Sequence, residues 1–124
     1  MSTRSVDLSK LPPEIQREVL RLQQLQQTLE VTLLQKQQLE LRLRETERAL
    51  KELEKAEEDA AVFKSVGSIL IRRDVATVRE ELEEERDILN IRLKALTRQE
   101  ERSRERLEGL QKRISKSLKS LGLT

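Results

Sequence analysis

The stretch that decides the fold is A-V-F-K-S-V-G-S-I-L-I-R-R, residues Ala61 to Arg73, in the middle of the chain. It holds the only Phe of the protein and several β-branched apolar residues, whereas its flanks consist mainly of Leu, Gln and charged residues. β-branched and aromatic residues favour strands, and a glycine between two such runs supplies a turn. We therefore expect a β-hairpin over about residues 61–72, with its turn at Gly67.

The segments on both sides of this hairpin are typical of long helices. Pro12 and Pro13 suit the first turn of a helix, where Pro is tolerated, and Glu14 places a negative charge at its positive end. No Gly or Pro follows until beyond Asp59, which predicts a first helix over about 13–59. Asp74 is predicted to be the N-cap of a second helix over about 75–120.

Both helical segments carry apolar residues at the a and d spacing of a coiled coil. In the first segment the two rows are Ile15, Leu22, Leu29, Lys36, Leu43 and Leu50, and Leu25, Thr32, Leu39, Thr46 and Leu53. In the second they are Val75, Leu82, Leu89, Leu96, Ser103 and Leu110, and Leu93, Leu107, Ile114 and Leu121, interrupted by Arg86 and Glu100. Two arms of equal length predict a mostly α fold in one domain, residues 1–124. It is a long antiparallel two-helix coiled coil with a single central β-hairpin. A single continuous helix is disfavoured by Gly67 and the β-rich run.

A lone two-stranded hairpin is marginally stable in water, and its unpaired edges invite pairing with another chain. The sequence therefore predicts that the hairpin is an assembly element that completes a sheet or barrel between subunits. A strained linker between two helices is the alternative. The residues assigned to assembly are Val62, Phe63, Val66, Gly67, Ile69, Leu70 and Ile71.

The two ends of the chain carry more apolar residues than a narrow coiled-coil seam can cover. In an antiparallel coiled coil these ends meet at the tip far from the hairpin, and an exposed apolar patch there predicts a binding site. Ordinary seam packing with a few exposed Leu is the alternative. The candidate binding residues are Leu11, Ile15, Val19, Leu20, Leu22, Ile114, Leu118, Leu121 and Leu123.

The composition argues against several classes of function. Among 124 residues, 39% are charged and 1% aromatic, and there is no His and no Cys. Thiol chemistry and Cys-based metal sites are excluded, no catalytic or cofactor-binding motif is present, and we assign no catalytic, cofactor or metal residue. The apolar runs are too short to span a membrane and the N-terminus lacks a signal core, so we expect a cytoplasmic protein. The net charge of +2 is too small to predict nucleic-acid binding.

The combined pattern resembles the β-type subunits of archaeal-style prefoldin. The most specific motif is V-F-K-S-V-G-S-I-L-I, from Val62 to Ile71, which matches the hairpin pattern of that family. Further similarity lies in L-P-P-E-I-Q at Leu11–Gln16, in the Gln-rich run at Leu25–Leu41, and in L-N-I-R-L-K-A-L-T-R-Q-E at Leu89–Glu100. The resemblance covers nearly the whole chain.

The resemblance implies a hexamer of two α-type and four β-type subunits, in which the hairpins form a double β-barrel platform and the coiled coils extend from it. It also implies an ATP-independent chaperone that holds unfolded client proteins at the coiled-coil tips and delivers them to a group II chaperonin. Two alternatives remain from the residues themselves. One is a structural coiled-coil scaffold without client binding, and the other is a helical arm that binds RNA.

Overall fold

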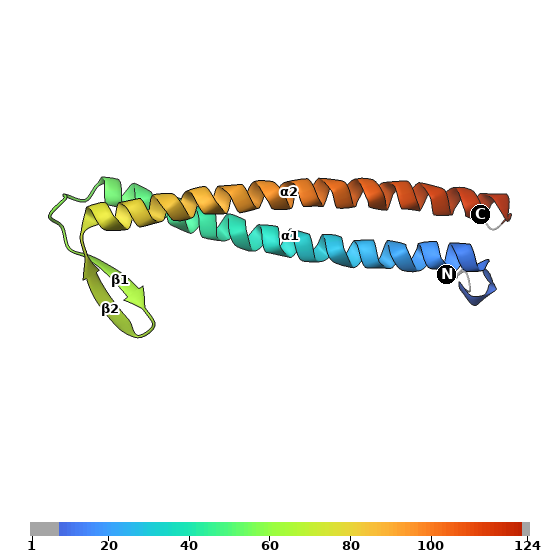
Figure 1. Cartoon of the computed structure of the whole chain (residues 1–124), viewed down its shortest axis with the longest axis horizontal. Coiled ribbons are helices and arrows are strands. Elements are labelled where there is room, and N and C mark those ends of the chain that lie inside the picture. The colour runs from blue at the N-terminus through green and yellow to red at the C-terminus, as the bar shows by residue number, and fades with distance from the viewer. Residues whose placement is uncertain (1–7, 123–124) are drawn as a thin grey trace, which may run out of the picture. The chain divides into compact units, whose positions relative to one another are not determined.

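The computed structural model describes residues 8–122. A short 3-10 helix, η1 (Leu8–Lys10), precedes the long helix α1 (Pro13–Glu54). Strands β1 (Val62–Val66) and β2 (Ile69–Arg73) follow, and helix α2 (Val75–Ser120) completes the fold (Figure 1). Two long helices with one antiparallel hairpin between them confirm the predicted mostly α fold class.

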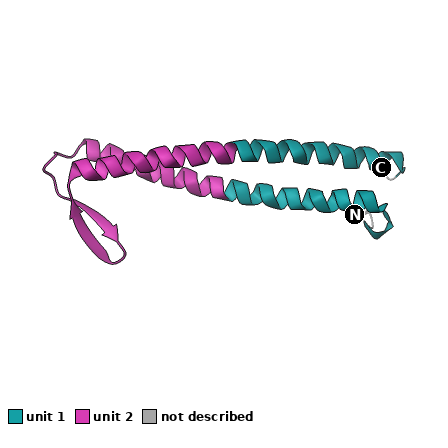
Figure 2. Ribbon diagram, viewed as in Figure 1, with its two compact units in different colours: residues 1–34, 98–124 teal, residues 35–97 magenta. Residues whose placement is uncertain are grey.

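The chain divides into two compact units (Figure 2). Unit 1 comprises residues 1–34 and 98–124 and so contains both chain ends, whereas unit 2 comprises residues 35–97 and contains the hairpin. In each unit a part of α1 and a part of α2 run side by side in opposite directions. That the whole chain behaves as one domain stays a prediction.

The seam of unit 1 follows the heptad rows predicted from the sequence. Leu29, Leu110 and Ile114 are buried, and so is Thr32, which is only 1% exposed. The Thr32 hydroxyl donates to the Thr28 carbonyl over 2.9 Å and accepts from the Gln99 side-chain amide over 3.3 Å. A buried hydroxyl with both a donor and an acceptor partner avoids the cost of an unpaired polar group.

The seam of unit 2 is built in the same way. Leu50, Leu53 and Leu89 are buried, and Val75 at the start of α2 is completely inaccessible. Thr46 is buried and its hydroxyl donates to the Arg42 carbonyl over 2.9 Å. Every predicted seam position in both units is buried or half-buried, with the exception of the exposed Leu121.

Helix α1 ends at Glu54 and not near Asp59. The N–H groups of Lys55 and Ala56 donate to the carbonyls of Glu52 and Leu53, which is the tighter hydrogen bonding typical of a helix end. The acidic run at residues 57–59 would place negative charges at the negative end of the helix dipole, and this disfavours extension. The absence of Gly and Pro was therefore not sufficient to predict where the helix ends.

The hairpin has a two-residue turn at Gly67 and Ser68, and its register pairs Val66 with Ile69 and Val62 with Arg73. Gly67 has a φ of 60°, while no other residue type in the described chain has a positive φ. A positive φ at the first turn position alone corresponds to a type II′ turn, in which glycine is preferred at that position. The turn predicted at Gly67 is therefore confirmed, with the hairpin at 62–73.

Candidate assembly and client-binding surfaces

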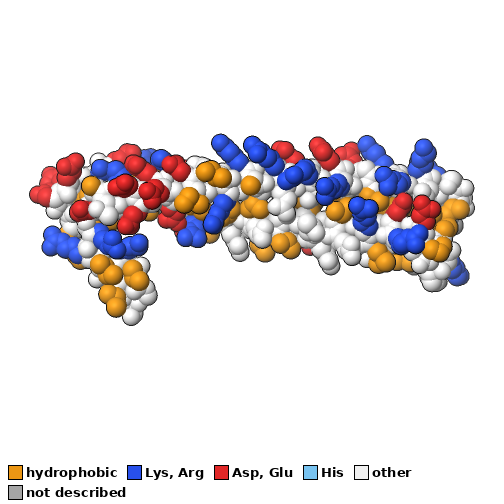
Figure 3. All heavy atoms as spheres, in the orientation of Figure 1, with side chains coloured by type: hydrophobic (Ala, Val, Ile, Leu, Met, Phe, Trp, Pro, Cys, Tyr) orange, Lys and Arg blue, Asp and Glu red, His pale blue; other side chains and the backbone are white. Residues whose placement is uncertain are grey.

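Apolar side chains lie on both faces of the hairpin. Because side chains alternate along a strand, one face carries Val62, Val66, Ile69 and Ile71, and the opposite face carries Phe63 and Leu70. Phe63 is 57% exposed, Ile69 63% and Leu70 69%. The hydrophobic side chains gathered on the hairpin are visible in Figure 3. Val62 at the base is half-buried, but no element of the described chain covers the other five, which are free to pack against another molecule.

The base of the hairpin is fixed to helix α2 within unit 2. Glu81 of α2 forms ion pairs with Lys64 of β1 over 3.5 Å and with Arg73 of β2 over 3.4 Å. Asp74 follows β2 directly and accepts a hydrogen bond from the Thr77 N–H over 3.0 Å, which caps α2 as predicted. One carboxylate thus links both strands to the helix, while the turn end remains uncovered.

The sequence alone did not identify Glu81 as a positioning residue for the hairpin. It is one of five Glu in the stretch Glu80–Glu85, and these five look alike in the sequence. Only the turn of the chain at Asp74 brings the base of the hairpin within reach of the second turn of α2. No local pattern distinguishes Glu81 from its neighbours.

The hairpin can extend its sheet by pairing with another strand. The sheet consists of β1 and β2 alone, so each strand has one edge that no other strand of the described chain pairs with. Unpaired edges and exposed apolar faces are the features by which strands from different chains assemble into a shared sheet. The role of the hairpin in assembly stays a prediction, for which these edges and faces provide the surface.

The nine residues predicted for client binding occupy different environments in unit 1. Leu11, Ile15 and Ile114 are buried, at 5% to 7% exposure. Val19, Leu22 and Leu118 are half-buried, whereas Leu20 and Leu121 are exposed. Leu123 lies outside the described residues. The accessible apolar surface of this group thus comes from Leu20 and Leu121, with partial contributions from the half-buried three.

The described residues contain no group of three or more His, Cys, Asp or Glu side chains that could hold a metal ion. Between residues 8 and 122, no helix is both long and apolar enough to cross a membrane.

Two long helices joined by a central β-hairpin define the class of protein as a helical hairpin with a two-stranded sheet at its centre. Comparisons with known proteins identify the family. The model of the family described as "Prefoldin subunit" matches residues 16–120. Prefoldin subunit beta of Methanothrix thermoacetophila is 44% identical over 109 residues, 88% of this chain and 91% of that protein. Prefoldin subunit beta of Archaeoglobus fulgidus is 42% identical over 90% of this chain and 96% of that protein.

A solved structure shows the same fold. The crystal structure of the prefoldin beta subunit from Thermococcus strain KS-1 superposes with a TM-score of 0.79 at 36% identity. The similarity covers 88% of this chain and 96% of that one. The chain therefore belongs to the prefoldin subunit family and is of the β-subunit type. The resemblance inferred from the sequence is confirmed. Members of this family are co-chaperone components that assemble with other prefoldin subunits.

Proposed function

We propose that this chain is a subunit of an ATP-independent holdase that captures unfolded proteins and delivers them to a group II chaperonin. The assembly contains two α-type and four β-type subunits, and this chain supplies β-type subunits. The observation that carries the proposal is the hairpin with apolar side chains exposed on both faces, above all Phe63, Ile69 and Leu70. The proposal places the assembly in the cytoplasm together with its chaperonin.

Clients bind at the accessible apolar residues of unit 1 in this proposal. Leu20 and Leu121 are exposed and offer contact without any rearrangement. Leu11, Ile15 and Ile114 belong to the same set but become available only where the helix ends separate from each other. Several shallow apolar contacts, repeated on several subunits, hold a client through multivalency and still allow its release.

Light scattering of a denatured client diluted into buffer without nucleotide tests the proposal. This chain is mixed with an α-type partner, and the tip variant carries Leu20→Ser and Leu121→Ser. The matched control carries Leu41→Ser and Ile88→Ser, which alter two residues of similar exposure in unit 2. We expect the unchanged assembly and the control to suppress aggregation, and the tip variant to assemble but suppress it less.

Three results would contradict parts of the proposal. An assembly of the expected mass that leaves aggregation unchanged rejects the holdase function and favours a structural scaffold. A tip variant as effective as the unchanged chain rejects Leu20 and Leu121 as client contacts. Failure to assemble with any α-type subunit rejects the hexamer itself.

A further inference from the structure

Unit 1 contains a pocket whose rim is formed by three arginines. The pocket has a volume of about 270 Å³ and is lined by Arg21 and Leu25 of α1 and by Arg106, Gly109, Leu110 and Arg113 of α2. None of the described residues that line it is acidic. Leu110 is buried and Leu25 half-buried, so the pocket has an apolar floor below a basic rim.

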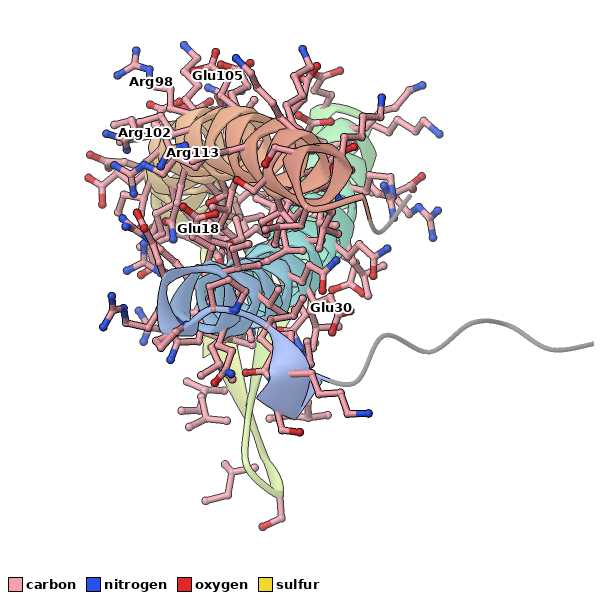
Figure 4. All side chains as sticks on the ribbon, turned by 90° about the vertical axis from the view of Figure 1, so that its right-hand side faces the viewer. Glu18, Glu30, Arg98, Arg102, Glu105 and Arg113 are labelled. Atoms are coloured by element: carbon pink, nitrogen blue, oxygen red, sulfur yellow. The ribbon has the colours of Figure 1, made fainter. Side chains whose placement is uncertain are left out.

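The three guanidinium groups lack an ion-pair partner among the described residues. Arg104, Lys112 and other basic residues form ion pairs, but Arg21, Arg106 and Arg113 form none within 4.0 Å with any residue from 8 to 122. Glu18 is a nearby acid on α1, and Figure 4 shows it between the two helices. Its Oε2 is inaccessible and without a hydrogen-bond partner, and among the described residues Glu18 forms no ion pair with the three arginines within 4.0 Å.

The pocket is part of a longer basic stripe on α2. Arg98, Arg102, Arg106 and Arg113 follow one another at spacings of four, four and seven residues, which places them within an arc of about 80° on the helix surface. Arg98, Arg102 and Arg113 lie on the same side of α2 in Figure 4. Gly109 falls inside this arc and has no side chain, which opens the surface between Arg106 and Arg113.

Charge is distributed unequally between the two units. The described residues of unit 1 include eleven Lys and Arg against seven Asp and Glu, a net charge of +4. Unit 2 has thirteen against fifteen, a net charge of −2. The net charge of the whole chain is small because the positive charge of unit 1 is partly offset by the negative charge of unit 2. Beyond Glu108, α2 contains four basic residues and no acidic one.

We propose that the pocket formed by Arg21, Arg106 and Arg113 binds the carboxylates of an acidic polypeptide segment, which continues along Arg102 and Arg98. Guanidinium groups are planar donors that match the geometry of carboxylates. The three arginines at the pocket rim have no ion-pair partner among the described residues, so their positive charges can complement the negative charges of the segment. The apolar floor at Leu25 and Leu110 accommodates the methylene groups of a Glu side chain or an apolar neighbour in the segment. A polypeptide is favoured over a nucleic acid because the chain has a single aromatic residue, Phe63 in the hairpin, so the pocket has no aromatic side chain on which a base could stack.

Fluorescence anisotropy with the full chain tests this inference. The probe is a dye-labelled oligoglutamate peptide at low salt, and an oligoglutamine peptide with the same dye is the neutral probe. The pocket variant carries Arg21→Gln, Arg106→Gln and Arg113→Gln. The control variant carries Arg44→Gln, Arg48→Gln and Lys51→Gln, exposed residues of α1 in unit 2, and changes the net charge equally. Circular dichroism verifies that both variants keep their helices.

We expect oligoglutamate to bind and oligoglutamine not to bind, with affinity falling as salt is added. The pocket variant should bind about tenfold more weakly, because three exposed ion pairs are each weak, and the control variant about as well as the unchanged chain. Equal losses in both variants would show that only net charge matters and would overturn the proposal, as would an absence of oligoglutamate binding. Tighter binding of a single-stranded oligonucleotide that is also lost in the pocket variant would reassign the pocket to nucleic acid. Because the assay uses neither clients nor an α-type partner, its failure is distinguishable from failure of the holdase proposal.

Discussion

At the scale of single residues, Asp74 shows how one side chain connects the hairpin to a helix. It follows strand β2 directly, and its carboxylate caps the first turn of α2. Hydrogen bonds from the Thr77 side chain and from the Thr77 N–H lower the pKa of Asp74 below its ordinary value of 3.8. The ionised form is therefore the one that stabilises the helix start.

We expect Asp74→Ala to lower the melting temperature at neutral pH, since it removes the cap. Because the folded pKa lies below the unfolded value, the contribution of Asp74 is complete above pH 3.8 and is lost as the pH falls through the folded pKa. The difference in melting temperature between the two proteins should therefore shrink in acid. Circular dichroism melts across a pH series measure this difference.

The control is Asp74→Asn, since Asn also caps helices but does not ionise. It should keep most of the neutral-pH stability and remove the pH dependence that this site causes. If Asp74→Ala melts at the same temperature as the unchanged chain at neutral pH, the cap does not stabilise α2.

Gly67 has a backbone conformation that favours glycine over any other residue. Its φ of 60° is unfavourable for L-residues, although an added Cβ would meet nothing within 4 Å. We expect Gly67→Ala to destabilise the hairpin by about 1 kcal/mol through backbone strain alone. Amide hydrogen exchange of the strand residues should accelerate accordingly. Ser68→Ala is the matched control in the same turn, and an equal acceleration in both variants would contradict this explanation.

At the scale of the elements, the heptad pattern was sufficient to predict which face of each helix is buried. Leu29, Leu50, Leu89 and Leu110 were assigned to the seam from their spacing and are buried. The regular 3.5-residue repeat carries this information, because it keeps the same face toward the partner helix. The polar seam residue Thr32 fits as well, since it finds hydrogen-bond partners inside the seam.

Other features of the helices could not be read from the pattern. Continuing the second row of α1 backward by one heptad from Leu25 reaches Glu18, a charged residue at a seam position. The end of α1 at Glu54 depends on charges at the helix terminus, which the apolar rows do not record. The arginine pocket requires residues from two helices that lie far apart in the sequence, and Gly109, which has no side chain, is one of its lining residues.

The seam predicts that two leucines close in the sequence differ greatly in how much their replacement by Ala lowers the free energy of unfolding. Leu29 is 7% exposed and Leu34 is 55% exposed, both on α1 in unit 1. We expect Leu29→Ala to lower the free energy of unfolding by about 3 kcal/mol, because it removes buried apolar atoms and leaves a cavity. Leu34→Ala should change it by less than about 0.5 kcal/mol. Chemical denaturation followed by circular dichroism measures both, and similar losses would show that the seam lies elsewhere.

At the scale of the whole molecule, the surfaces that the chain leaves uncovered point to its partners. An isolated two-stranded hairpin with exposed Phe63, Ile69 and Leu70 contributes little to the folding stability of its own chain. The unpaired edges have the geometry for strand addition, and the family to which the chain belongs assembles with other prefoldin subunits. We therefore expect the hairpin to act between chains, and its role in assembly stays a prediction.

This reasoning predicts that hairpin variants separate folding from assembly. Ile69→Lys with Leu70→Lys places a charge on each face of the hairpin, at residues 63% and 69% exposed in the single chain. Because both side chains already face solvent, we expect the free energy of unfolding of the isolated chain to change by less than about 0.5 kcal/mol. In an assembly the same positions would bury unpaired ammonium groups, which is strongly unfavourable. Size-exclusion chromatography with light scattering, on a mixture with an α-type subunit, should show loss of the large complex.

Ile91→Lys is the matched control, since Ile91 is 68% exposed on α2. If the hairpin variant still forms the large complex while Ile91→Lys does not, the assembly surface lies on the helices and the role assigned to the hairpin is wrong.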